Sequence, residues 1–94
     1  MTYKLKFVPA ALKEWDKLAP NLKQQFKKKL AERLEEPHII SAKLSGYESV
    51  YKIKLRSAGY RLVYEVQDDV LVVFVLAVGQ RENGSVYKNV SKRV

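Results

Sequence analysis

Cysteine is absent from this 94-residue chain, and histidine occurs only once. Without cysteine the chain can form neither a disulfide framework nor a thiolate metal site. No stretch reaches the ~18 consecutive apolar residues that a membrane-spanning helix needs, and the alternating N-terminus lacks the apolar core of a signal peptide. We therefore expect a protein of the reducing cytoplasm, with no membrane contact, no metal and no other cofactor.

Acidic residues are also scarce beside basic ones. Eighteen lysines and arginines are present with ten aspartates and glutamates, which gives a formal net charge of +8 at neutral pH. Such a surplus attracts polyanions and accelerates diffusional encounter with them, so a nucleic acid is the expected partner. Good solubility alone is the alternative explanation of this charge.

Length and hydrophobic content indicate one globular domain over residues 1–94. Hydrophobic residues make up 47% of the chain, which is too high for a disordered segment. A domain of this size buries only about 60–65% of the surface that its unfolded chain exposes, so the core is small.

The first part of the chain predicts one strand and two helices. Residues 3–7 alternate with a period of two, as a strand does. Pro9 and Pro20 each suit the first turn of a helix, where the missing N–H costs nothing, and Pro37 ends the second helix. The apolar positions expected to face the core are Leu12, Trp15 and Leu18 in the first helix and Leu22, Phe26, Leu30 and Leu34 in the second.

After a polar connection, three strands and a short helix are expected. Residues 50–55 and 60–66 alternate, whereas residues 70–78 are apolar almost throughout, as in a strand covered on both faces, and Gly79 ends them. The valines at positions 86, 90 and 94 indicate a terminal helix. The order β-α-α-β-β-β-α is an α+β fold, a small and mostly antiparallel sheet with two helices on one face and the short C-terminal helix on the other.

The two alternating strands predict a cluster of basic side chains. In the hairpin that they form, Lys54 lies opposite Arg61, and Lys52 lies about 6.6–7 Å along the same face. The following antiparallel strand brings Arg81 back towards Arg61, and the terminal helix brings Tyr87 to the same side. Like charges directly opposite one another destabilise a strand pair, so this uncompensated cluster indicates a phosphate-binding functional site. For Lys52 and Lys54 alone, a solvated outer strand face is the alternative.

Residues 51–56 (YKIKLR), 59–64 (GYRLVY) and 78–82 (VGQRE) resemble the corresponding segments of the RelE toxins of bacterial toxin–antitoxin pairs. The resemblance extends to ALKEW at 11–15 and VY at 86–87 and spans nearly the whole chain. It implies cleavage of mRNA in the ribosomal A site and neutralisation by a RelB-type antitoxin, with operator DNA contacted only through that antitoxin. The family's catalytic set corresponds to Lys52, Lys54, Arg61, Arg81 and Tyr87. Gln80 departs from the family, in which many relatives have a basic residue.

The residue types of this set suit RNA cleavage by the substrate's own 2′-hydroxyl. His38, the only histidine, is expected to be exposed in a connecting segment, and the sequence has no carboxylate cluster for magnesium. Attack by the 2′-hydroxyl requires a base, cations for the developing phosphorane charge and a donor to the 5′-oxygen.

Each member of the set has an expected role in that reaction. We expect Lys54 to be the base, with Lys52 as the alternative, because neighbouring cations disfavour a protonated amine and lower its pKa. Lys52 and Arg61 would hold the phosphate, and Arg81 would stabilise or protonate the leaving oxygen. Tyr87 would orient the 2′-hydroxyl or stack on a base.

Basic residues of the second predicted helix lie away from its apolar stripe. They form either a solvated face or a contact with ribosomal RNA, whose backbone requires charge but no fixed geometry. These residues are Lys23, Lys27, Lys28, Lys29 and Arg33.

Two other functions stay open at this point. One is a ParE-like toxin of the same fold, which inhibits gyrase through protein contacts and needs no such catalytic set. The other is a non-catalytic RNA-binding module, which favours exposed aromatic side chains on a sheet face, whereas the sheet tyrosines here are expected to point inward.

Overall fold

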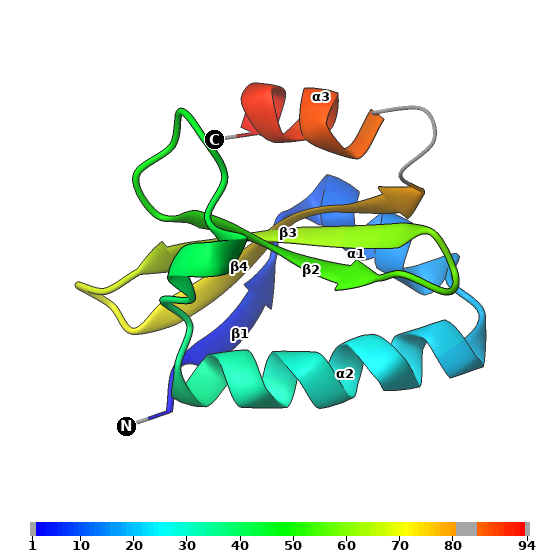
Figure 1. Cartoon of the computed structure of the whole chain (residues 1–94), viewed down its shortest axis with the longest axis horizontal. Helices are drawn as coiled ribbons and strands as arrows, with labels where there is room; N and C mark the ends of the chain where they lie inside the picture. The colour runs from blue at the N-terminus through cyan, green and yellow to red at the C-terminus, as the bar shows by residue number, and fades with distance from the viewer. Residues whose placement is uncertain (1, 81–84, 94) are drawn as a thin grey trace.

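The computed structural model describes residues 2–80 and 85–93 (Figure 1). In chain order the elements are β1 (Lys4–Phe7), α1 (Pro9–Asp16), α2 (Pro20–Glu35), the 3₁₀ turn η1 (Ile40–Ala42), β2 (Val50–Leu55), β3 (Tyr60–Gln67), β4 (Val72–Gln80) and α3 (Ser85–Arg93). The predicted β-α-α-β-β-β-α order and α+β class are confirmed. None of the described helices is both long and apolar enough to cross a membrane.

The four strands form one sheet in the order β1-β4-β3-β2. β1 runs parallel to β4, and the other neighbours are antiparallel. Figure 1 shows α2 on one side of this sheet and α3 on the other, where α3 contacts β4 and β3. The predicted distribution of the helices over the two faces is therefore confirmed, and β2 is left at an edge of the sheet.

Buried apolar side chains form one layer on each face of the sheet. The larger layer lies under α1 and α2, and its largest fully buried members are Phe26, Leu30, Ile53, Leu62 and Tyr64. The smaller layer lies under α3 and consists of Val50, Val63, Leu76, Ala77 and Val90. Since β4 contributes to both layers, its nearly continuous apolar sequence was correctly interpreted as a strand covered on both faces.

The three prolines act at helix boundaries as predicted. Pro9 and Pro20 occupy the first turns of α1 and α2. Glu36, which precedes Pro37, leaves the helical region with φ −140° and ψ 85°. Steric conflict between the proline ring and the preceding residue explains why α2 ends at Glu35.

The prediction for the last strand was wrong at both ends. β4 begins at Val72 because residues 68–71 form a turn, in which Leu71 adopts the left-handed conformation with φ 55°. Gly79 does not end the strand but pairs with Arg61 of β3. The backbone of a glycine can donate and accept ladder hydrogen bonds like that of any other residue.

The first helix differs from its predicted apolar face at Leu12, and Leu18 is buried as predicted but follows the end of α1 at Asp16. Trp15 is buried, as predicted, and lies 5.4 Å from Phe7 between ring centroids. Leu12, however, is 45% exposed, and Ala11 is buried instead.

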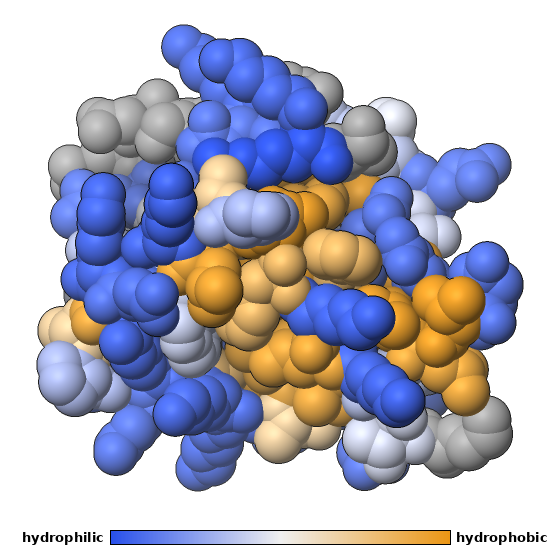
Figure 2. Space-filling view, turned by 180° about the vertical axis from the view of Figure 1, so that it is seen from behind, coloured by the Kyte–Doolittle hydropathy of each residue, from blue (hydrophilic) through white to orange (hydrophobic). Residues whose placement is uncertain are grey.

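Seen from behind the view of Figure 1, the surface has apolar side chains at its centre surrounded by hydrophilic ones (Figure 2).

Candidate active site

The β2–β3 hairpin has the register that the sequence predicted. Lys54 pairs with Arg61, and Lys52 pairs with Val63. On its other side Arg61 pairs with Gly79 of β4, which ends at the next residue. The end of β4 thus returns to the position of Arg61, as expected, and Lys52, Lys54 and Arg61 belong to the sheet face that α3 covers.

These three cations differ strongly in their exposure. Lys54 is exposed, Lys52 is half-buried, and Arg61 is only 5% exposed. The guanidinium of Arg61 donates to the carbonyl oxygen of Tyr60 through Nη1 at 3.1 Å. An arginine remains charged when buried, and its attraction for an anion is stronger away from water. Arg61 therefore provides a fixed positive charge, and Lys54 provides the accessible amine.

The two remaining members of the predicted catalytic set are described only in part. Arg81 lies outside the described residues, and Tyr87 is described through its backbone in α3 but not through its side chain. The placement of α3 is set by Val90, which is fully buried against Val63 and its neighbours. The helix that carries Tyr87 therefore lies on the predicted face.

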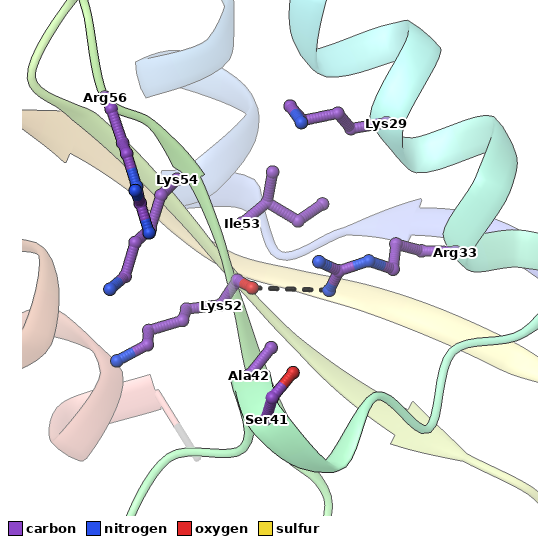
Figure 3. A pocket seen from close by; sticks show the side chains of 8 residues that line it. All are labelled: Lys29, Arg33, Ser41, Ala42, Lys52, Ile53, Lys54 and Arg56. Atoms are coloured by element: carbon purple, nitrogen blue, oxygen red, sulfur yellow. Dashed lines mark hydrogen bonds between the residues drawn. The ribbon is translucent and has the colours of Figure 1, made fainter.

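A basic cavity of about 360 Å³ opens along the outer edge of β2 (Figure 3). Five of its eight lining residues are lysine or arginine, and none is acidic. The lining residues are Lys29, Arg33, Ser41, Ala42, Lys52, Ile53, Lys54 and Arg56. In Figure 3, Lys29 and Arg33 come from α2, whereas Lys52 and Lys54 extend from β2. The cavity therefore connects the two predicted catalytic lysines with the basic side of α2.

Arg33 has a structural contact that its helix position did not predict. Its Nη1 donates to the hydroxyl of Tyr64 at 2.9 Å and to the carbonyl oxygen of Lys52 at 3.3 Å. Burial raises the pKa of Tyr64, and the hydrogen bond from Arg33 opposes that effect. Arg33 thus joins α2 to β2, rather than belonging to a purely solvated helix face.

The other four basic residues of α2 have the expected position. Lys27, Lys28 and Lys29 are exposed, and Lys23 is half-buried. All four lie off the buried stripe of Leu22, Phe26 and Leu30.

His38 was expected to be exposed, but it belongs to a hydrogen-bond network. Its Nδ1 lies 3.1 Å from the hydroxyl of Tyr51, and its Nε2 lies 2.8 Å from Oδ1 of Asp68. The hydroxyl of Tyr3 donates to the same Asp68 oxygen at 2.5 Å. Hydrogen bonds from Tyr3 and His38 hold the pKa of Asp68 below its ordinary value of 3.8. Since Tyr51 packs in the layer under α1 and α2, this network lies on the opposite face from Arg61.

The described part of the site offers amines and a guanidinium rather than metal ligands. Among residues 2–80 and 85–93, no group of three or more histidine, cysteine, aspartate or glutamate residues could hold a metal ion. The arrangement can bind a phosphodiester and stabilise negative charge that develops on it.

Comparison with known proteins finds toxins of type II toxin–antitoxin systems, both by sequence and by structure. A family model described as "ParE toxin of type II toxin-antitoxin system, parDE" matches residues 5–84. The "mRNA interferase toxin RelE" of Escherichia coli (strain K12) is 54% identical over 94 residues, which cover 100% of this chain and 99% of the relative.

Solved structures agree with this result. A mutant of E. coli toxin RelE in the free state has a TM-score of 0.93 at 53% identity, covering 100% of this chain and 99% of that one. The toxin in the intact E. coli RelBE toxin–antitoxin complex has a TM-score of 0.83 at 56% identity, and the match covers 85% of this chain and 98% of that one.

The fold and these matches define the class, because the family model spans most of the chain. The chain belongs to the family of ParE toxins of type II toxin–antitoxin systems. The relatives reported above that match it over its whole length are RelE toxins, and the resemblance found in the sequence is thereby confirmed.

Proposed function

We propose that this protein is a RelE-type endoribonuclease toxin that cleaves mRNA held in the ribosomal A site and thereby stops translation. The observation that carries the proposal is the opposed Lys54–Arg61 pair with Lys52 on the same sheet face, in a chain 54% identical to an mRNA interferase over its whole length.

In the proposed reaction, the substrate supplies the nucleophile. A lysine amine, Lys54 or alternatively Lys52, removes the proton from the 2′-hydroxyl, and the 2′-oxygen attacks the adjacent phosphorus in line. The bond from phosphorus to the 5′-oxygen breaks as the new bond forms. The products are a 2′,3′-cyclic phosphate and a 5′-hydroxyl, whose oxygen receives its proton from Arg81 or from solvent water.

Positive charge lowers the barrier of this reaction. Arg61 and Lys52 bind the non-bridging oxygens, on which negative charge grows in the phosphorane-like transition state. Arg81 stabilises the leaving 5′-oxygen, and Tyr87 orients the 2′-hydroxyl or stacks on a base. A metal ion is not required, because the cations of the protein take over charge stabilisation.

The ribosome supplies the alignment that the small domain lacks. Flexible RNA rarely adopts the in-line geometry, and fixed orientation can lower a barrier by several kcal/mol. The exposed lysines of α2, Lys27, Lys28 and Lys29, would contact the backbone of ribosomal RNA, with Lys23 and Arg33 beside them. The cavity that adjoins Lys29 and Lys54 makes a continuous basic path between the two RNA contacts.

A RelB-type antitoxin would neutralise the protein in the cytoplasm, as the RelBE complex suggests for its E. coli relative. Operator DNA would then be contacted only through the antitoxin. Displacement of α3 is the proposed means of inhibition, since this nine-residue helix has one fully buried apolar side chain among its described residues, Val90.

Toeprinting of a translated mRNA with and without the protein tests the proposal. Cleavage within the A-site codon is the expected result. The family model carries the name of ParE toxins, so a gyrase supercoiling assay belongs beside it. Inhibition of gyrase without mRNA cleavage would replace this proposal by the ParE-like function, and RNA binding without either effect would indicate a non-catalytic module.

A further inference from the structure

Helix α3 depends on contacts with the rest of the protein for its position. It comprises only the nine residues Ser85–Arg93, and isolated helices shorter than about 12–15 residues are marginal in water. Among its described residues, Val90 supplies a fully buried apolar contact with the sheet. Polar contacts of α3 with the sheet and α1 add to this contact in holding the helix.

Two described side chains of α3, Asn89 and Arg93, contact the same side chain of α1. Glu14 Oε1 accepts from Nη1 of Arg93 at 2.9 Å, and Glu14 Oε2 accepts from Nδ2 of Asn89 at 3.3 Å. Asn89 and Arg93 lie four residues apart, so they share one face of α3. The side chains of Arg93 and Glu14 are only 19% and 26% exposed, so solvent and salt screen this ion pair less than a fully exposed one.

The same pair completes the hydrogen bonding of a strand edge. β1 ends at Phe7, and the N–H of Val8 donates to the carbonyl oxygen of Val75 at 3.1 Å. Beyond this point the described residues give β4 no neighbouring strand on that side, and backbone groups there require other partners.

Glu14 and Arg93 supply those partners. The carbonyl oxygen of Leu76 accepts from Nη1 of Arg93 at 2.8 Å, and the N–H of Val78 donates to Oε1 of Glu14 at 3.1 Å. Because the sheet fixes both side chains, the pair has one defined geometry. It joins α1, on one face of the sheet, to α3, on the other, around the edge that β1 is too short to cover.

We propose that Glu14 is a positioning residue that fixes α3, the helix that carries Tyr87, over the sheet. The proposal rests on the catalytic role of Tyr87 given under Proposed function. Glu14 itself touches no substrate; it determines the fraction of molecules in which α3 is docked.

Glu14→Gln keeps the shape of the side chain but removes the charge that Arg93 requires. We expect the backbone amides of residues 88–93 to exchange at least tenfold faster with solvent. The single-turnover cleavage rate on programmed ribosomes should fall severalfold, with the half-saturating ribosome concentration unchanged within twofold. Arg93→Gln, near the chain end, should have the same effects, whereas Glu36→Gln, an exposed charge beyond α2, should have none.

A double-mutant cycle with Tyr87→Ala distinguishes positioning from a general loss of stability. If Glu14 acts through Tyr87, Glu14→Gln should slow cleavage no further in the Tyr87→Ala background. The proposal would be overturned if Glu14→Gln slowed cleavage equally in the wild-type and Tyr87→Ala backgrounds. It would also be overturned if hydrogen exchange of the α3 amides were unchanged in both Glu14→Gln and Arg93→Gln. If Tyr87→Ala alone leaves cleavage intact, the catalytic role of Tyr87 fails, and hydrogen exchange still decides whether Glu14 holds α3.

Discussion

Lys54→Ala and Arg61→Ala should separate catalysis from stability, because the two residues face each other across the β2–β3 hairpin but differ in burial. Lys54 is exposed, so its removal takes away an amine without opening the core. Arg61 is 5% exposed and hydrogen-bonded to the backbone, so its removal takes away both a charge and packed side-chain atoms.

The expected magnitudes follow from these positions. Loss of a general base slows a reaction by about 10²–10⁴-fold, and loss of a preorganised donor to a developing oxyanion slows it by about 10²–10³-fold. Both variants should therefore cleave far more slowly. The free energy of unfolding should change by less than about 0.5 kcal/mol for Lys54→Ala but should fall by about 1–3 kcal/mol for Arg61→Ala.

Single-turnover cleavage on programmed ribosomes and urea unfolding measure the two quantities on the same protein samples. Lys4→Ala is the matched control, since Lys4 is an exposed strand lysine at the opposite edge of the sheet. Near-wild-type cleavage by Lys54→Ala would refute its assignment as the base, and Lys52→Ala should then be the slow variant. Near-wild-type cleavage by Lys54→Ala, Lys52→Ala and Arg61→Ala would refute the proposed active site.

Three further predictions concern the products, acid stability and inhibition. Cleavage of unmodified mRNA should yield a 2′,3′-cyclic phosphate or its 3′-phosphate hydrolysis product, and chelators should have no effect. A single 2′-deoxy substitution just upstream of the cut should abolish cleavage. Cleavage of the deoxy substrate would mean that water is the nucleophile. The pKa of Asp68 is lower in the folded protein than in the unfolded chain. The ionised carboxylate therefore stabilises the fold fully above about pH 3.8, and this contribution is lost as the pH falls through the pKa of the folded protein. Asp68→Asn should accordingly show a shallower loss of stability in acid, and a pH profile identical to that of the wild type would count against the Tyr3–Asp68–His38 network. Antitoxin binding should change the hydrogen-exchange protection of α3, whereas unchanged protection would mean inhibition by occlusion or charge neutralisation.

The sequence sufficed for those features that depend on local pattern. The period-two strands fixed the pairing of Lys54 with Arg61 once the turn was located, because each side chain's face follows from its position in the alternation. Prolines at positions 9, 20 and 37 located helix ends for steric reasons that need no tertiary information.

Other features depend on tertiary contacts that no local pattern contains. In the sequence, Arg33 has the pattern of a solvated cation on a helix. Its hydrogen bonds to Tyr64 and Lys52 of the sheet form only in the folded chain. His38 acquires its partners from Tyr51 and Asp68, 13 and 30 residues away. Glu14 is the extreme case, since its bonds to Asn89 and Arg93 span 75 and 79 residues.

The most direct test of the central claim compares the same mRNA free in solution and in a programmed ribosome with an empty A site. We expect kcat/KM to be larger on the ribosome by orders of magnitude, because orientation of the scissile phosphate comes from the ribosome. The advantage should shrink as salt rises, since docking is electrostatic, and it should shrink when Lys27, Lys28 and Lys29 are replaced by alanine. A ratio near one would contradict the account and make the protein a general ribonuclease.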